Sequence, residues 1–274
     1  MDHSPPPGTP AEGAPDPGWD AGWALGLVNS PDRATLLADL AACVAAGRGF
    51  TLATLNLDHL VKLRTDGAFR TAYGAHSHVV ADGNPVVWLR RMAGRPVRLV
   101  PGSELVWPLC RMAAQAGLKV ALVGSTEAAL AAAAARLEKA CPGLEIVLRI
   151  APSFGFDPEG AEAGACIDRL AEAGIGLCLI ALGAPRQERF AIRAAARLPG
   201  AGFASIGAGL DFIAGTQRRA PWVMRKLALE WLWRMASDPL RLTRRYAACF
   251  AILPGMARSA RQQGREAQHE KPRR

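Results

Sequence analysis

Polar residues and glycines gather at the positions in this sequence where predicted strands end. They are Thr54 and Asn56, Asp82, Gly124 and Ser125, the stretch from Gly183 to Glu188, and the stretch from Gly207 to Asp211. A carboxylate such as Asp82 could remove a proton from a hydroxyl as a general base, or could simply cap the following helix. Because ligands of open α/β sheets bind outside the carboxyl ends of the strands, the placement of these residues predicts a binding site there.

The stretch Gly-Ala-Pro-Arg-Gln-Glu at 183–188 combines turn residues with polar side chains. Gly183 permits a tight turn or the close approach of a ligand, and Pro185 suits the first turn of a helix. Arg186, Gln187 and Glu188 would then project from a helix start that points at the strand ends. They could be routine surface residues or ligand contacts, and the pattern alone leaves both interpretations open.

Phosphate and metal motifs are weak or absent. The sequence Gly-Ser-Thr at 124–126 opens a helix whose free amides could hold a phosphate, but a plain turn explains it equally well, because the dinucleotide fingerprint and the P-loop lysine are missing. The sequence holds no Asp-x-Asp pair, which many sugar-nucleotide enzymes use to bind a divalent metal. A leaving diphosphate would therefore need arginines, amides or helix termini to balance its charge. His76 and His78 lie in a polar stretch and are predicted at the surface rather than on a metal.

Apolar runs typical of strands alternate with helical patterns along most of the chain. Strands are predicted at 26–28, 50–55, 79–81, 119–123, 145–150, 177–182 and 203–206. Helices are predicted between them, among them 34–46, one from the end of the second strand to about 73, 102–116 and 126–139. This alternation predicts an α/β fold, with a Rossmann-like, mainly parallel sheet flanked by helices.

Composition divides the chain into four parts. Residues 1–22 are rich in proline and glycine and are expected to form a disordered leader, and residues 23–215 form the α/β domain. Residues 216–254 are basic, amphipathic and expected to be helical, and residues 255–274 form a polar basic tail. The whole chain has a net charge of +9, yet residues 216–274 contain 14 Lys/Arg and only 4 Asp/Glu. The cationic character is thus confined to the C-terminal fifth, which predicts an anionic partner for that part.

The basic segment 216–254 has two interpretations. Tryptophans and leucines recur at helical spacing among its arginines, as in helices that lie on a membrane surface. An ordinary helix that docks an apolar stripe on the core would have the same pattern, and both could hold at once. Six scattered cysteines without a Cys-x-x-Cys motif predict reduced thiols rather than disulfides or zinc.

Several stretches together resemble the WecG/TagA/CpsF family of bacterial glycosyltransferases (glycosyltransferase family 26), over about residues 24–248. The residues that carry the resemblance are Thr54-Leu55-Asn56, Ala81 to Trp88, Pro101 to Leu105, Gly183 to Glu188, Gly207 to Asp211, Arg219-Ala220-Pro221, Leu229 to Trp231, Arg234, Asp238 to Arg241 and Arg244 to Tyr246. Two positions depart from the family pattern, Glu104 in place of Asp and Asp238 in place of Glu. Both keep the charge, so only fine geometry is affected.

The resemblance implies an inverting hexosyltransferase that needs no metal or other cofactor. It would move a hexose-type sugar, such as N-acetylmannosamine or its uronic acid, from a UDP-sugar to a polyprenyl-diphosphate-linked saccharide in cell-surface polysaccharide or exopolysaccharide synthesis. The resemblance also implies a cytoplasmic protein bound peripherally to the inner face of the bacterial plasma membrane. Its partners would be the donor, the acceptor and an anionic membrane surface, without nucleic acid, and the oligomeric state, including a homo-oligomer, stays open.

The family's roles are carried over position by position. Asp82 would be the catalytic base, Thr54 an assisting polar group, and Asn56 the group that orients the sugar or acceptor. Gln187 and Glu188 would contact the donor sugar or phosphate, and Gly207 to Asp211 would border the nucleotide. The remaining residues predicted to bind substrate are Gly124, Gly183 and Arg186, together with Arg218, Arg219, Arg225 and Arg234 as candidates for diphosphate contact.

Two other classes share part of the pattern. A nucleotide-binding Rossmann-like oxidoreductase would show the same alternation of strands and helices, but its glycine fingerprint and acidic ribose partner are missing. A nucleic-acid-binding protein would explain the basic tail and would bind with a steep salt dependence. The spacing of tryptophan and leucine in the tail favours an interface over an arm that only follows phosphates.

Overall fold

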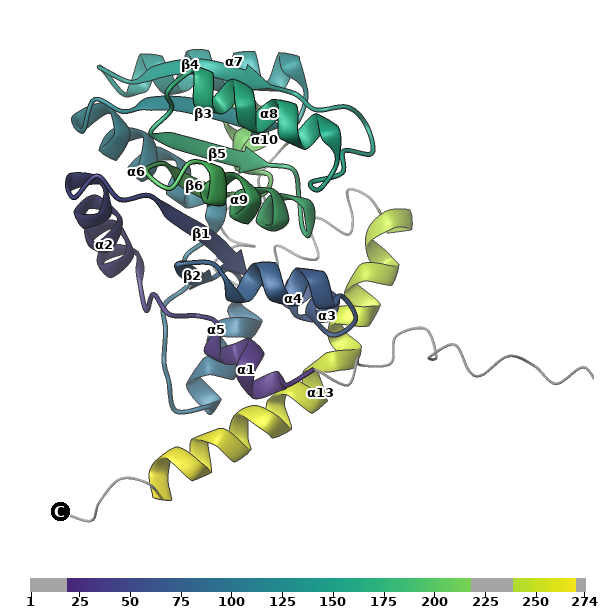
Figure 1. The fold of residues 1–274 in the computed structure, drawn as a ribbon. Coiled ribbons are helices and arrows are strands. Elements are labelled where there is room, and N and C mark those ends of the chain that lie inside the picture. The colour runs from purple at the N-terminus through teal and green to yellow at the C-terminus, as the bar shows by residue number, and fades with distance from the viewer. Residues whose placement is uncertain (1–18, 218–238, 270–274) are drawn as a thin grey trace, which may run out of the picture.

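The structure is a computed structural model that describes residues 19–217 and 239–269 (Figure 1). Its described strands form one sheet of six, all parallel, in the spatial order β2-β1-β6-β5-β3-β4. They are β1 (Phe50–Leu55), β2 (His78–Ala81), β3 (Lys119–Gly124), β4 (Glu145–Ile150), β5 (Leu177–Ala181) and β6 (Gly202–Ser205). The predicted α/β fold with a parallel sheet is confirmed.

Helices cover both faces of the sheet, so most strand residues are buried and apolar on both sides. One face packs against α2 (Arg33–Ala45), α6 (Gly102–Gln115), α7 (Glu127–Ala140) and α10 (Gly209–Ala214). The other face packs against α8 (Ala161–Glu172) and α9 (Arg186–Arg197). Beside β1 and β2, a further cluster joins α1 (Ala21–Gly26), α3 (Leu57–Leu63), α4 (Gly67–Gly74), α5 (Asn84–Met92) and α13 (Pro239–His269).

The connections between strands reverse direction near the centre of the sheet. From β3 the chain passes through α7 to β4 on one side, whereas from β5 it passes through α9 to β6 on the other side. Neighbouring strands whose connections diverge in this way leave space at their carboxyl ends, where ligands of such sheets bind. Gly124 at the end of β3 and Gly183 just after β5 lie at this point.

Two predicted elements are wrong. Residues 26–28 are not a strand, because α1 ends there. Its start is capped by Asp20, whose carboxylate accepts a hydrogen bond from the amide of Gly22 at 2.8 Å. The single helix predicted after β1 is two helices, α3 and α4, since the Asp66 carboxylate starts a second helix by accepting from the Phe69 amide at 2.8 Å.

The C-terminal helix α13 continues through Pro254-Gly255, where the sequence predicted a boundary between the appendage and the tail. The side chains of Cys249, Ile252, Met256 and Ala260 are buried, and the last three pack in one cluster with α1, α3, α4 and α5. This burial keeps the helix intact past the proline, so this part of the basic segment is a docking helix. None of the helices in the described ranges has the length and apolarity required to cross a bilayer.

Candidate active site

At the carboxyl edge of the sheet, the chain turns at residues with positive φ. At or just after the ends of β2, β3, β5 and β6 these residues include glycines, namely Gly83 (φ 118°), Gly124 (φ 112°), Gly183 (φ 71°) and Gly207 (φ 57°). Side chains other than hydrogen are disfavoured there, so the glycines allow the chain to turn sharply away from the edge. The sequence-predicted residues on β1, β2, β3, β5 and β6 therefore line one edge, as expected.

The first part of the site lies at the ends of β1 and β2. The Asp82 amide donates to the carbonyl of Leu55 at 2.7 Å, which joins the two strand ends, and the Asp82 side chain is half-buried. Thr54 is 3% exposed and faces the start of α6, where a Cβ on Gly102 would lie 3.2 Å from its methyl carbon. Asn56 is the N-cap of α3, and its side-chain oxygen accepts from the His59 amide at 3.1 Å. Thr54, Asn56 and Asp82 are thus brought together as predicted.

The second part is the start of α9, where Gln187 and Glu188 are 2% and 0% exposed. The side-chain nitrogen Nε2 of Gln187 donates to Glu188 Oε1 at 2.8 Å, and Gln187 Oε1 accepts from the backbone amide of Gly207 at 3.2 Å. Gln187 therefore ties the end of β5 to the end of β6. Both side chains are buried groups of the site, whereas their neighbour Arg186 is exposed.

Glu188 lies in an apolar environment that disfavours its charged form. Burial raises its pKa to about 7, although the hydrogen bond from Gln187 opposes the shift. Its Oε2 atom has no hydrogen-bond partner among the described residues. The pKa of the neighbouring Tyr73 hydroxyl is raised well above its ordinary value by burial and then by the charges of Glu188 and Asp82. Both carboxylates therefore oppose ionisation of the Tyr73 hydroxyl.

His59 extends the polar network behind Asn56. One ring nitrogen, Nδ1, lies 3.1 Å from the Tyr73 hydroxyl, and the other, Nε2, lies 3.5 Å from the amide nitrogen of Asn56. Burial lowers the pKa of His59 to about 3, so the ring is neutral near pH 7. With Asn56 as the donor to Nε2, the proton sits on Nδ1 and donates to the oxygen of Tyr73. The ring thereby fixes both side chains.

The third part lies at the end of β3, beside α10. Ser125 has φ 55°, and its hydroxyl donates to Asp211 Oδ1 at 2.5 Å. Thr216 Oγ1 also lies 3.4 Å from Asp211 Oδ1 and 3.2 Å from the Asp211 carbonyl oxygen. A Cβ on Gly124 would lie 2.4 Å from the carbonyl oxygen of Ala181, so only glycine fits between β3 and β5. Asp211 is therefore held beside the end of β3, where the connections of the sheet diverge.

Other predictions fall outside this edge. Arg218, Arg219, Arg225 and Arg234, the candidates for diphosphate contact, lie outside the described residues, as do the tryptophans of the segment and the leader up to residue 18. His76, predicted at the surface, is 6% exposed, because its ring packs beside Tyr73 and Nδ1 lies 2.9 Å from the Ala72 carbonyl oxygen. His78 is half-buried.

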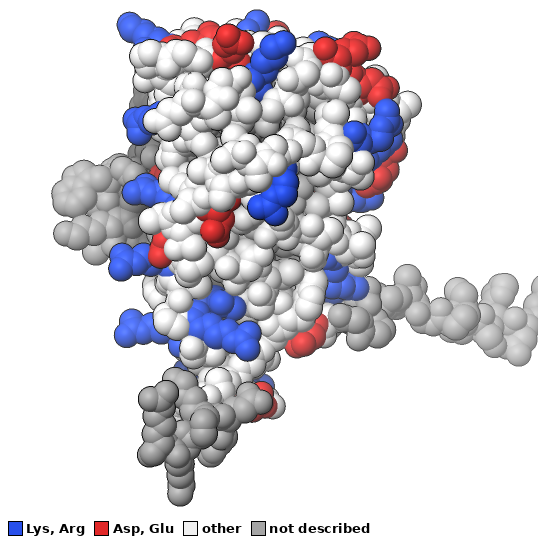
Figure 2. Space-filling model, turned by 60° about the vertical axis from the view of Figure 1, so that its left-hand side comes forward, with Lys and Arg blue, Asp and Glu red and all other residues white. Residues whose placement is uncertain are grey.

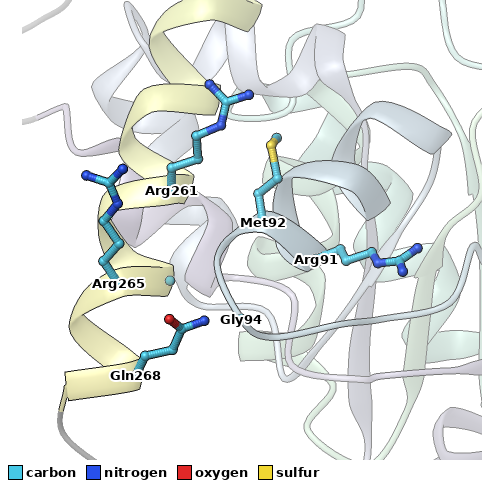
Figure 3. Close-up of a pocket in the computed structure, with 7 residues that line it drawn as sticks. Arg91, Met92, Gly94, Arg261, Arg265 and Gln268 are labelled. Carbon is cyan, nitrogen blue, oxygen red and sulfur yellow. The ribbon is translucent and has the colours of Figure 1, made fainter.

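A basic hollow lies between α5 and α13, formed by parts of the chain other than the carboxyl edge. It has a volume of about 270 Å³ and is lined by Arg91, Met92, Gly94, Arg261, Gly264, Arg265 and Gln268. Figure 3 shows Arg261 and Arg265 on α13, beside the helix that carries Arg91 and Met92. A Cβ on Gly264 would lie 2.4 Å from the Met92 carbonyl oxygen, so this glycine lets the two helices approach closely.

On the face shown in Figure 2, acidic side chains stand among the basic ones.

Fold and site together define an α/β protein whose parallel sheet carries, at the carboxyl ends of its strands, one half-buried aspartate, a buried amide and carboxylate, and glycine turns. Open α/β sheets of this kind bind their ligands at the carboxyl ends of the strands. The model of the glycosyl transferase WecG/TagA/CpsF family matches residues 25–267, and the chain belongs to that family. The match covers α13 as well as the sheet, so the C-terminal helix is part of the family's shared structure and the protein is a glycosyltransferase.

Several groups of the site were not predicted from the sequence. Neither Tyr73 nor His59 is assigned a role by the sequence patterns above. Ser125 was considered at a helix start that could hold a phosphate or form a plain turn, rather than as a partner of Asp211. Among the described residues, no three His, Cys, Asp or Glu side chains cluster as a metal site would require. A signal for His59 exists in its position three residues after the N-cap Asn56, on the first turn of a helix that starts at the site.

Proposed function

We propose that this glycosyltransferase moves a hexose-type sugar from a UDP-sugar to a polyprenyl-diphosphate-linked saccharide, with inversion and without a metal ion. The single observation that carries the proposal is Asp82, a half-buried carboxylate at the end of β2, in a chain whose family membership covers residues 25–267. Its setting supports a general base, because the side chain retains access to solvent while Thr54 and Asn56 stand beside it on the next strand.

In an inverting transfer, the acceptor oxygen attacks the anomeric carbon while the diphosphate leaves from the opposite face. Asp82 would take the hydroxyl proton of the acceptor as the new bond forms. Glu188 is a poorer base for this step, because it is 0% exposed and its Oε1 already accepts a hydrogen bond from Gln187. We assign Glu188 and Gln187 to the donor side, where their buried groups would orient the sugar or phosphate.

Stabilising the leaving diphosphate requires positive charge or amide donors. Three longer helices begin at this edge without a side-chain cap: α5 after Gly83, α6 after Pro101 and α9 after Pro185. The positive ends of helix dipoles favour anions, so these starts support binding of a diphosphate without metal. Arg218, Arg219, Arg225 and Arg234 stay candidates for the same task.

A donor screen tests the proposal directly. The full chain is incubated with a panel of UDP-hexoses, including UDP-N-acetylmannosamine and its uronic acid, and a polyprenyl-diphosphate-linked sugar, and UDP release is measured with and without EDTA. We expect release with at least one donor, dependent on acceptor and insensitive to EDTA, and a product of inverted anomeric configuration. Lack of UDP release across the panel would remove the proposed reaction, and loss with EDTA would remove its metal independence.

We further propose that the enzyme works on the cytoplasmic face of the plasma membrane, held there by basic residues of its C-terminal part. The net charge of +10 over residues 216–274 and the three arginines of the hollow between α5 and α13 support attraction to an anionic surface. Truncation of this part is a poor test, because it would remove Ile252, Met256 and Ala260 from the core.

A charge variant is a cleaner test of membrane binding. Arg91, Arg261 and Arg265 are replaced together by glutamine, and co-sedimentation with vesicles of phosphatidylcholine and phosphatidylglycerol is compared with that of the unchanged chain. The control replaces Arg48, Arg111 and Arg169, which are exposed on other parts of the molecule. We expect binding to fall for the first triple variant, by roughly 1 kcal/mol per charge, and to fall less for the control. Equal losses would mean that only net charge matters.

A further inference from the structure

Helix α3 connects the C-terminal helix to the candidate active site. Its N-cap is Asn56, and Figure 1 shows α3 beside α13. The buried stripe of α13 that includes Cys249, Ile252 and Met256 continues toward the start of the helix, where Arg245 lies four residues before Cys249. Residues four apart lie on the same side of a helix, so Arg245 faces the body.

Arg245 reaches a carboxylate that is nearly enclosed. Its Nε atom lies 2.9 Å from Asp58 Oδ1, and the Asp58 side chain is only 11% exposed. Burial alone would raise the pKa of Asp58, but the charges of Arg245 and Lys62 outweigh that effect and hold the pKa below its ordinary value. The Arg245 side chain is itself 43% exposed, so the enclosed carboxylate is what distinguishes this pair from one exposed at both ends, which contributes little to stability.

Lys62 carries the connection from α3 to the turn before α9. Its ammonium group lies 2.8 Å from Asp58 Oδ2 and donates to the carbonyl oxygen of Ala184 at 2.9 Å. Ala184 belongs to the turn that leads into Gln187 and Glu188, and the charge of Lys62 lowers the pKa of Glu188 against the larger effect of burial. One ammonium group therefore contacts both the carboxylate that α13 holds and the backbone of the donor-side turn.

We propose that Arg245, Asp58 and Lys62 form a charged bridge through which α13 fixes the Ala184 turn, and with it Gln187 and Glu188, for glycosyl transfer. The inference rests on the proposed function for its catalytic consequence and on the observed contacts for its structural one. The three residues are positioning residues and do not touch the substrate. The bridge gives the C-terminal helix a task at the site besides packing and attraction to a membrane.

The first test compares Arg245→Gln with Arg258→Gln, which removes the same charge from an exposed position on the same helix. Donor kcat and KM are measured from UDP release, and amide hydrogen exchange is followed by mass spectrometry in the full chain. We expect Arg245→Gln to lower kcat/KM for the donor by about tenfold to 10²-fold, because small displacements of aligned groups are costly. Exchange should rise at residues 184–188 and stay unchanged in β3 and β5. Lys62→Met should show the same pattern, and Arg245→Lys should restore part of the activity.

A double variant tests whether the residues act as one unit. If they do, Asp58→Asn combined with Arg245→Gln should lose no more than the worse single variant, since both changes break the same connection. Three results would each overturn the bridge. The losses of the double variant could be additive, hydrogen exchange could rise throughout the sheet, or Arg245→Gln could match Arg258→Gln in kcat/KM and exchange. If the unchanged chain releases no UDP from any donor, the proposed function fails, and the exchange at residues 184–188 alone decides on the bridge.

Discussion

The two halves of the candidate site are built in different ways. At the ends of β1 and β2, and on the helices beside them, side chains dominate, with Thr54, His59, Tyr73 and Glu188 all at most 5% exposed. At the end of β3, by contrast, the backbone dominates, with Gly124 and Ser125 both at positive φ. The first half shifts the pKa values of its groups through burial, whereas the second half offers close-fitting turns and a single carboxylate, Asp211.

This difference indicates a division of tasks along one sheet edge. A half with fixed, desolvated side chains suits proton transfer and orientation of the sugar, because those steps depend on the protonation state of individual groups. A half made from turns suits a nucleotide, because its backbone can approach phosphates and rings closely. Variants in the first half should therefore change kcat and its pH dependence, and variants in the second half should change donor affinity.

The largest effect is expected for Asp82→Asn. Amide in place of carboxylate keeps the shape but cannot accept the acceptor's proton, so kcat should fall about 10²- to 10⁴-fold with little change in donor KM. Asp39→Asn, an exposed carboxylate on α2, serves as the control. Activity close to that of the unchanged chain would remove Asp82 from the base role and with it the contrast between the halves.

The second effect is expected for Gly124→Ala in the backbone half. At φ 112° with its Cβ 2.4 Å from the Ala181 carbonyl oxygen, alanine should lower the free energy of unfolding by about 3 kcal/mol and raise donor KM. Gly174→Ala is the matched control, since that glycine has φ 61° but nothing within 4 Å of an added Cβ. Urea titrations of both variants measure the difference, and equal losses would mean that the approach of β3 to β5 is not tight.

Much of the edge was predictable because its signals are local. Central strands of a parallel sheet are buried on both faces and read as continuous apolar runs, so the bounds 50–55 match β1. The edge strand β4 is partly exposed, yet its apolar residues still indicate the bounds 145–150. Asp82 and Gly183 stand where such runs stop. The failures also have local reasons: Leu27 and Val28 read as a strand, but Asp20 caps a helix just before them.

The buried network was not predictable because it depends on packing between distant segments. The contact of His59 with Tyr73 requires α3 and α4 to fold against each other, and the contact of Asp58 with Arg245 requires α13 to dock first. No spacing rule connects residues on separate helices. The raised pKa of Glu188 likewise follows from burial, which a polar motif after a strand does not reveal.

The third effect concerns the pH dependence of stability in the side-chain half. With a folded pKa near 7 and an ordinary value near 4.5, Glu188 binds more protons in the folded than in the unfolded chain between these values. The free energy of unfolding therefore falls as pH rises from 5 to 8, by about 2 kcal/mol. Glu188→Gln should remove that part of the slope, whereas the exposed Glu172→Gln should leave it. Urea titrations at several pH values measure it, and an unchanged slope would mean that Glu188 is ionised at little cost.

The smallest effect is expected for Ser125, where two variants separate its hydrogen bond from its backbone conformation. Ser125→Ala loses the bond to Asp211 and keeps the strain of φ 55°, while Ser125→Gly loses the bond and relieves the strain. Both should raise donor KM about fivefold, in line with the roughly 1 kcal/mol of a typical hydrogen bond, and leave kcat unchanged. The free energy of unfolding should be about 1 kcal/mol higher for Ser125→Gly than for Ser125→Ala. A fall in kcat at constant KM would place Ser125 with the reacting groups, and the division between the two halves would then lie between β3 and β4 rather than at the centre of the sheet.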